Sequence, residues 1–283
     1  MARSVQPDDR ATETREILLV RDGHETRRAD LLASEEPMAI RVAGPGGAPV
    51  DVAVTMRTPG NDEDLAIGFL VSEGLIAPAD VDRVEHGHPG TVATPENELL
   101  VRLNRPFDSS TVAARAFVVS ASCGVCGKAS LEDVEVRCPV LPPGPVVAAT
   151  TILAMPDRLR ARQVIFEQTG GLHAAGLFDP DGALLDLRED VGRHNAVDKV
   201  VGAAARRGEL PLHGRVLFVS GRVSFEIIQK AAVAGAPVVA AVSAPTDLAV
   251  AAARRVGMTL VGFVRAGGYN VYTGEERIMP RGR

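Results

Sequence analysis

Several features that would define other protein classes are missing from this sequence. Hydrophobic residues make up 46% and charged residues 24%, the balance of an ordinary globular protein. The net charge is −5, so no basic excess indicates a nucleic acid or an anionic membrane surface as a partner. The longest apolar stretches, such as 237–244, are too short to span a bilayer, and residues 1–10 have no apolar core typical of a secretory signal. Any anion site must therefore be built locally.

Cysteine is also scarce. Three cysteines in 283 residues do not form a disulfide framework, so the reducing cytoplasm is the expected location. Two of them form the run Cys123-Gly-Val-Cys126, flanked by Ser122 and Lys128. Lys128 and the start of a following helix would favour the thiolate, which is the nucleophilic form. Buried structural cysteines usually lie among large apolar groups, so we predict a reactive pair that exchanges disulfides or carries a persulfide.

A structural zinc site is a competing interpretation of the same pair. Such a site needs four ligands, normally from a second C-x-x-C or a paired histidine motif, and the sequence has neither. Only Cys138 and scattered histidines would remain as ligands. A thioredoxin-like motif would lie early in a compact βαβ domain, usually after an aromatic residue, whereas Ser122 precedes this one. We therefore predict no metal, and we assign Cys138 no role.

The pattern of residues predicts a two-domain α/β protein. Four prolines in the eight residues 138–145 cannot continue a helix or a central strand, which marks the boundary. The second half alternates strands and helices, which predicts right-handed crossovers and a partly parallel sheet. The expected parts are a mobile tail at 1–15, a mixed α+β domain at 16–146, an α/β domain at 147–274 and a tail at 275–283. Among the expected elements are helices at 61–74, 159–168, 195–207, 224–234 and 246–256, and strands at 17–20, 38–42, 50–56, 99–103, 116–120, 172–178, 183–187, 215–219, 237–242 and 259–264.

The ends of three predicted strands suggest a second functional region. Open α/β sheets bind ligands beyond the carboxyl ends of their strands, here 220–224, 243–247 and 263–268. The first two lead into helix N-termini, which favour an anion, and Arg222 and Arg265 offer guanidinium groups suited to phosphate. Each feature alone also fits a helix cap, a turn or a solvated arginine. Together they predict a phosphate-bearing ligand, while the absence of G-x-G-x-x-G and of a P-loop argues against a dinucleotide redox cofactor and ATP hydrolysis.

A third feature is the run Arg193-His194-Asn195, which lies just before a predicted helix. This place suits ligand contact as well as capping. His194 is the histidine to test first, although spacing alone favours a capping or packed histidine.

Six separated segments of the sequence follow one another in the order typical of one family. They are Met56–Asn61, Ala66–Gly74, Ser120–Lys128, Thr169–Gly176, Glu189–Ala196 and Gly221–Glu226. Together they closely resemble the formate dehydrogenase accessory sulfurtransferase family (FdhD), over about residues 16–275.

The resemblance implies a cytoplasmic sulfur carrier. A cysteine desulfurase would deliver sulfur as a persulfide on Cys123, with Cys126 assisting. The carrier would then pass the sulfur to the molybdenum or tungsten of a bis(guanine dinucleotide) pterin cofactor, which formate dehydrogenase needs. Two other classes stay open: a thiol–disulfide oxidoreductase, and a chaperone that only holds the cofactor.

The resemblance also implies where the cofactor binds and which fold holds it. The family's C-terminal domain resembles cytidine deaminase, but this sequence has neither H-x-E nor P-C-x-x-C, so we predict neither zinc nor deamination. A homodimer is expected. The implied cofactor-binding residues, together with the strand-end residues above, are Phe263, Val264, Arg265, Ala266, Gly267, Gly268, Arg222 and Ser243.

Overall fold

The computed structural model describes residues 8–87, 94–113 and 139–280. Cys123, Cys126 and Cys138, and the strand predicted at 116–120, therefore lie outside the described residues. Within the described ranges, no helix has the length and apolar character needed to cross a membrane.

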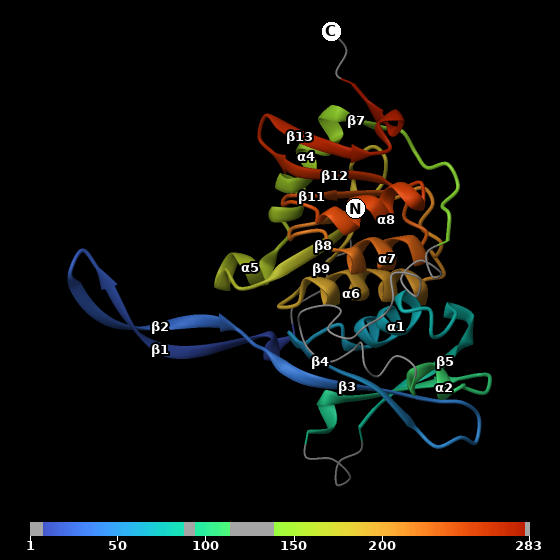
Figure 1. The fold of residues 1–283 in the computed structure, drawn as a ribbon. Coiled ribbons are helices and arrows are strands. Elements are labelled where there is room, and N and C mark those ends of the chain that lie inside the picture. The colour runs from blue at the N-terminus through green and yellow to red at the C-terminus, as the bar shows by residue number, and fades with distance from the viewer. Residues whose placement is uncertain (1–7, 88–93, 114–138, 281–283) are drawn as a thin grey trace.

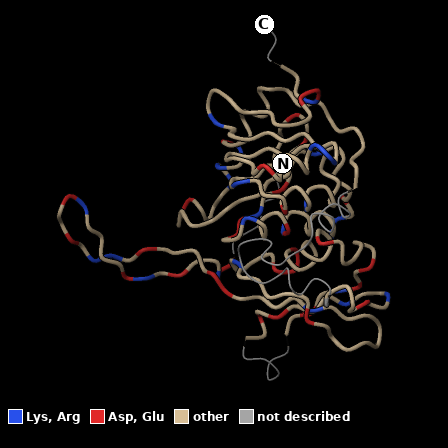
Figure 2. The backbone as a smooth tube through the Cα atoms, viewed as in Figure 1, with Lys and Arg blue, Asp and Glu red and all other residues tan. Residues whose placement is uncertain are grey.

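The chain begins with a long β-hairpin that projects from the body of the protein and carries charges of both signs along its length (Figures 1 and 2). It consists of β1 (Thr12–Arg21) and β2 (His24–Ala33), joined by Asp22 and Gly23 at positive φ, as a tight hairpin turn requires. A 3₁₀ turn at Asp9–Ala11 precedes it. Residues 9–15 of the segment predicted as a mobile tail thus form this 3₁₀ turn and the first part of β1. Polar residues can form the start of β1 because its hydrogen bonds to β2 do not require burial.

A four-stranded sheet and one helix complete the first half. The sheet has the order β4-β3-β6-β5, with β3 and β6 parallel and the outer pairs antiparallel. Acidic residues in the first turn of the helix, α1, favour its N-terminus, as the sequence predicts. The bounds are β3 (Glu36–Ala43), β4 (Val50–Arg57), α1 (Asp62–Ser72), β5 (Val81–His86), β6 (Glu98–Leu103) and α2 (Ser110–Ala113), with 3₁₀ turns at Pro78–Asp80 and Pro95–Asn97.

The second half contains a six-stranded sheet of order β13-β12-β11-β10-β8-β9. The three strands β10, β11 and β12 are parallel neighbours, which confirms the predicted partly parallel sheet. The bounds are β7 (Val147–Ala148), α4 (Ala149–Arg160), α5 (Val164–Thr169), β8 (His173–Phe178), β9 (Leu184–Asp190), α6 (Arg193–Arg206), β10 (Val216–Val219), α7 (Phe225–Val233), β11 (Val238–Ala241), α8 (Asp247–Arg255), β12 (Thr259–Arg265), β13 (Gly268–Thr273) and β14 (Ile278–Met279), with a 3₁₀ turn at Glu275–Arg277.

Two predictions for this half need correction. The helix expected at 159–168 corresponds to α5 and to the last two residues of α4, and the rest of α4, which contains Pro156, was not predicted. The tail expected at 275–283 is ordered as far as Met279, since β14 pairs with β7 and Ile278 packs against a hydrophobic cluster.

The two faces of the six-stranded sheet pack against different helices, as alternation along β10 shows. Val216 and Phe218 belong to the cluster that includes α4 residues, whereas Leu217 and Val219 belong to the larger core that includes α6, α7 and α8 residues. Next to α6 lies α1, with the four-stranded sheet beyond it (Figure 1). The larger core therefore contains residues from both halves of the chain.

The two halves meet where α1 packs against α6. A Cβ atom added at Gly68 would lie 1.8 Å from the Asp198 carbonyl oxygen, and one at Gly202 would lie 1.8 Å from that of Asp64. Two helices can approach this closely only because both contact positions are glycine. The predicted boundary at residue 146 thus separates two halves that share a core, and the division into two domains stays a prediction.

Candidate functional site

The carboxyl ends of β10, β11 and β12 lie side by side and are bonded to one another. The Val242 amide donates to the Val219 carbonyl (3.2 Å), and the Phe263 amide donates to the Ser243 carbonyl (3.2 Å). Val223 and Pro245 form a parallel bridge between the first two loops. The three strand ends singled out in the sequence therefore form one continuous edge.

The residues predicted to bind the cofactor differ in how exposed they are along this edge. Arg265 is exposed and its guanidinium lies 5.2 Å from the centre of the Phe263 ring, a cation–π arrangement. Phe263 itself has a φ of 53°, which bulky residues rarely adopt, and it lies within β12 where the pairing with β13 shifts register between Gly262 and Arg265. Val264 is fully buried in the core, so only its backbone is available to a ligand. In the rest of the set, Arg222, Ala266 and Gly267 are exposed, and Ser243 and Gly268 are partly buried.

A small pocket of about 110 Å³ lies beside this edge. Two of its residues come from element starts: His173 is the first residue of β8, and Arg193 is the first residue of α6. A Cβ atom added at Gly221, in the loop after β10, would lie 3.2 Å from His173 Nδ1 and 3.6 Å from Arg193 Cβ. The lining residues are Glu35, Thr55, Met56, His173, Val191, Gly192, Arg193, His194 and Asn195.

His194 connects this pocket to the start of α7. Its Nε2 lies 3.1 Å from Ser224 Oγ and 3.9 Å from the Glu226 carboxylate. Burial, aided by the positive charges of Arg193 and Lys230, lowers the pKa of His194 to about 4. The imidazole is therefore neutral near pH 7 and can either donate a hydrogen bond to Ser224 or accept one from it. This partly buried, bonded histidine agrees with the packed role that spacing favours.

A buried ion pair holds the pocket in place. Lys199 Nζ lies 2.7 Å from the Asp190 carboxylate, and both side chains are almost completely buried. Asp190 also accepts from the Thr58 amide (3.2 Å) and the Gly192 amide (2.8 Å). Asn195 donates to Asp190 (3.0 Å) and to the carbonyl of Met56 (2.7 Å). The segments 56–61 and 189–196, far apart in the sequence, are thus fixed together beside the pocket.

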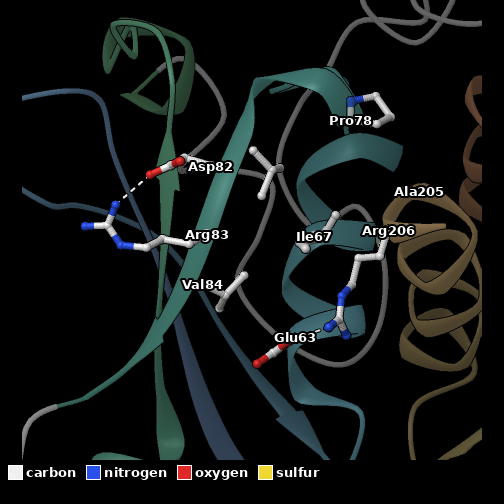
Figure 3. A pocket seen from close by; sticks show the side chains of 9 residues that line it. Glu63, Ile67, Pro78, Asp82, Arg83, Val84, Ala205 and Arg206 are labelled. Atoms are coloured by element: carbon white, nitrogen blue, oxygen red, sulfur yellow. Dashed lines mark hydrogen bonds and ion pairs between the residues drawn. The ribbon is translucent and has the colours of Figure 1, made fainter. Parts of the chain in front are cut away.

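A larger pocket, of about 320 Å³, lies elsewhere, between α1, β5 and the end of α6. Figure 3 shows Arg206 reaching toward Glu63 across its wall, at 2.7 Å. Arg83, on the other side, pairs with Asp82 at 2.6 Å. Its two arginines are thus neutralised by carboxylates, and unlike the smaller pocket it is not lined by His194 or by residues beside the loop after β10. We therefore place the candidate site at the smaller pocket and the strand ends.

Sequence reasoning missed one participant, His173. It lies inside the segment 169–176, but a histidine that begins a strand gives no local signal of a site. Only the pairing of β8 with β10, in which Ala175 lies opposite Val219, brings His173 next to the loop after β10. Among the described residues, no group of three or more potential metal ligands gathers here or elsewhere. The prediction that the protein binds no zinc stays a prediction.

Comparison with known proteins places this architecture in a family. A sequence profile of the FdhD/NarQ family matches residues 33–279. The chain belongs to the FdhD/NarQ family. It is 48% identical over 280 residues to a sulfur carrier protein FdhD of Streptomyces coelicolor, a match that covers 96% of this chain and 97% of the relative. It is 51% identical over 264 residues to a sulfur carrier protein FdhD of Mycobacterium tuberculosis, covering 89% and 92%.

A solved structure supports the fold of this FdhD/NarQ chain. A crystal structure of a candidate formate dehydrogenase accessory protein from Desulfotalea psychrophila matches with a TM-score of 0.72. The match covers 95% of this chain and 100% of that one, at 23% sequence identity. At this identity the comparison shows the shared mixed α/β fold and nothing more.

Proposed function

We propose that this protein is a sulfur carrier that serves the maturation of formate dehydrogenase. The observation that carries the proposal is the similarity, over nearly the whole chain, to curated proteins named sulfur carrier protein FdhD. The chain also has the cysteine pair Cys123 and Cys126 that such chemistry needs. We further propose that it acts in the cytoplasm as a homodimer.

In the proposed loading step, the Cys123 thiolate attacks the outer sulfur of a persulfide on a cysteine desulfurase. The desulfurase S–S bond breaks, its cysteine leaves as a thiolate, and a new S–S bond forms on Cys123. A persulfide is more acidic than a thiol, so the carried sulfur is anionic and nucleophilic near neutral pH.

In the proposed delivery step, the sulfur leaves as sulfide, which requires two electrons. Cys126 supplies them when its thiolate attacks Cys123 Sγ: hydrosulfide is released to the substrate and a Cys123–Cys126 disulfide forms. A cellular thiol reductant then restores both thiols. This scheme gives Cys126 the assisting role that the family resemblance implies.

The proposed recipient is the molybdenum or tungsten of a bis(guanine dinucleotide) pterin cofactor, which is this carrier's substrate. The strand-end edge supports this part of the proposal, because Arg222 and Arg265 follow two of its strands and both are exposed, with the Arg265 guanidinium beside the Phe263 ring. Guanidinium groups bind phosphate oxygens in a bidentate manner, and the dinucleotide carries such phosphates. Ser243 and the segment 263–268 would contribute backbone groups.

The test is the activity of formate dehydrogenase matured in cells that contain a variant of this chain. Cys123→Ala should abolish activity, since no persulfide can form. Cys138→Ala, which changes the same residue type outside the pair, is the matched control and should mature the enzyme normally. Full activity with Cys123→Ala would reject the sulfur-carrier proposal, and full activity with both Cys123→Ala and Cys126→Ala would favour a chaperone that only holds the cofactor.

A further inference from the structure

The β1–β2 hairpin, which we call the arm (Thr12–Ala33), projects from the body of the protein (Figure 1). Its base is anchored, because Ala33 packs against a small hydrophobic cluster that contains Ile165 of α5. Within the described part of the chain, β1 and β2 form a sheet of two strands only. A two-stranded sheet without a covering layer is marginally stable in water, so an arm with ten residues in each strand needs a surface to lie on.

The outer part of β1 carries more apolar surface than a solvent-exposed strand requires. The run Ile17-Leu-Leu-Val20 has four consecutive apolar residues, and Leu18 and Val20 are 50% and 59% exposed. Successive side chains of a strand point to opposite faces, so this run makes both faces of the arm apolar. A strand with one solvated face alternates apolar with polar residues, whereas a continuous apolar run is typical of a strand covered on both faces. The run therefore indicates that the arm is covered by another surface.

A second exposed apolar surface lies at the base of the arm. Val54 and Met56 project from β4, an edge strand of the four-stranded sheet, and Met56 lies opposite Pro37, close to where the arm ends. Val164, at the start of α5, is also exposed. Of the eleven exposed large hydrophobic side chains in the described ranges, six therefore lie on the arm or at its base: Leu18, Val20, Leu32, Val54, Met56 and Val164.

The charges of the arm favour a second copy of this chain as the occupant. Both signs are interspersed along its length (Figure 2), and three of its arginines pair with carboxylates of the arm itself. An arm without an excess of one sign does not match a strongly acidic or strongly basic partner. Its charged residues are Glu13, Arg15, Glu16, Arg21, Asp22, Glu25, Arg27, Arg28 and Asp30.

The arrangement of the two apolar surfaces also fits a second copy. The projecting arm and the exposed base belong to the same chain, so two copies related by a two-fold axis can each place an arm on the base of the other. Strands of ten residues reach about 33 Å, which is close to the diameter of a small domain. Stable interfaces take roughly 20–30 residues from each partner, and the arm with its base supplies about this number.

We propose that the arms form the contact of a homodimer, in which the arm of each copy lies on β4 and α5 of the other. The apolar run Ile17-Leu-Leu-Val20 of one copy then covers Val54 and Met56 of its partner. This inference deepens the homodimer of the proposed function and rests on that part of it alone. It requires neither a bound cofactor nor sulfur transfer.

The test is the molar mass of the full-length protein, measured by sedimentation equilibrium over a range of concentrations. The wild type should have twice the 29.7 kDa of one chain. Leu18→Glu combined with Val20→Glu places two carboxylates in the contact and should raise the dissociation constant about a hundredfold. Leu248→Glu makes the same kind of change at an exposed position of α8 and should leave the dimer intact.

A base variant and a cross-link test whether the two surfaces meet. Val54→Glu changes the base alone and should weaken the dimer as well. For the cross-link, the three native cysteines are replaced by alanine, and a Val20→Cys chain is mixed with a Val54→Cys chain. A short bismaleimide should join the two kinds of chain, whereas Val20→Cys mixed with Leu248→Cys should give no mixed product.

The outcomes separate this inference from the proposed function. A wild type that is monomeric at every concentration rejects both the arm contact and the homodimer. A dimeric wild type whose dissociation constant does not change in the Leu18→Glu, Val20→Glu variant rejects the arm contact and leaves the homodimer standing. If that variant stays dimeric but accepts sulfur from a cysteine desulfurase more slowly, the arm binds that partner and the inference is wrong. Sulfur loading of the wild type is measured separately, so failure of the sulfur-carrier proposal is recognised independently.

Discussion

The two ends of helix α6 carry the same residue type in opposite circumstances. Arg206, at the C-terminal end, lies 2.7 Å from Glu63 and 2.9 Å from Asp64, and the helix dipole favours a cation there. Arg193, at the N-terminal end, has no carboxylate among the described residues and opposes the dipole. The comparison indicates that Arg206 stabilises the contact between α6 and α1, whereas Arg193 is free of such ion pairs and is available to a ligand.

The glycine at the α1–α6 contact should give the largest effect. Gly202→Ala would place a methyl group 1.8 Å from a backbone carbonyl oxygen, and a backbone cannot move aside cheaply. We expect a loss of more than about 4 kcal/mol in the free energy of unfolding, measured by urea denaturation. Gly214→Ala, with nothing within 4 Å, is the control and should change little. A loss below about 1 kcal/mol for Gly202→Ala would contradict the close packing of the two helices.

The buried ion pair beneath the pocket should come next. Lys199→Met removes the charge that lies 2.7 Å from Asp190 and leaves that carboxylate buried. We expect a loss of about 3 kcal/mol in the free energy of unfolding, at the lower end for such pairs, because Asp190 keeps its other donors. Arg254→Gln, at an exposed position, should lose almost none. Equal stability of the two variants in urea denaturation would show that the Lys199–Asp190 ion pair does not stabilise the segments around the pocket.

A pH dependence should follow from the polar cluster between α6, α7 and α1. Lys230 lies 2.9 Å from Asp198 and 2.8 Å from Glu73. Burial raises the pKa of Asp198 to about 6 from 3.8, so between these values the folded protein keeps a proton that the unfolded chain releases. The contribution of Asp198 to stability is therefore present below about pH 4 and is lost as the pH rises through about 6.

Comparison with Asp198→Asn isolates this effect. From about pH 4 to pH 7, the stability of the wild type relative to the variant should fall by about 2 kcal/mol, measured by urea denaturation at each pH. A difference that stays constant, or that grows with pH, would show that Asp198 is ionised throughout this range.

The smallest expected effect on stability tests the comparison between Arg206 and Arg193 directly. Arg206→Gln removes two ion pairs of a half-exposed side chain and should cost about 0.5 kcal/mol. Arg193→Gln removes an unpaired charge and should cost nothing or increase the melting temperature slightly. If thermal unfolding shows that Arg193→Gln loses more stability than Arg206→Gln, Arg193 serves the fold and the comparison fails.

The sequence predicted much of the second half because its signals are local. The alternation of apolar strands and helices from 195 to 264 predicts a partly parallel sheet, and the strand-end edge follows from it. The same reasoning failed at 9–15, which form a 3₁₀ turn and the polar start of the β1–β2 hairpin, and at 278–279, where β14 forms by pairing with β7, which is distant in the sequence. It also missed most of α4, because Pro156 argues against a helix interior there, and it continued the predicted helix across the break at 161–163.

The site could be predicted only in part for a related reason. Arg222, Ser243 and the segment 263–268 stand out because they follow strands directly. His173 could not be identified in this way, because the antiparallel pairing of β8 with β10 is a long-range contact. The sequence also gives no sign that Arg193 lacks a carboxylate partner. That depends on which group each nearby carboxylate binds in the folded protein.

The most direct test of the sulfur-carrier proposal is mass spectrometry of the protein after incubation with a cysteine desulfurase and cysteine. The account predicts a gain of about 32 Da on the peptide that contains Cys123, in the wild type and in Cys126→Ala, and no gain in Cys123→Ala. No gain of mass in Cys126→Ala, where the internal disulfide cannot form, would contradict it, and a reversible Cys123–Cys126 disulfide in the wild type would then indicate a thiol–disulfide oxidoreductase.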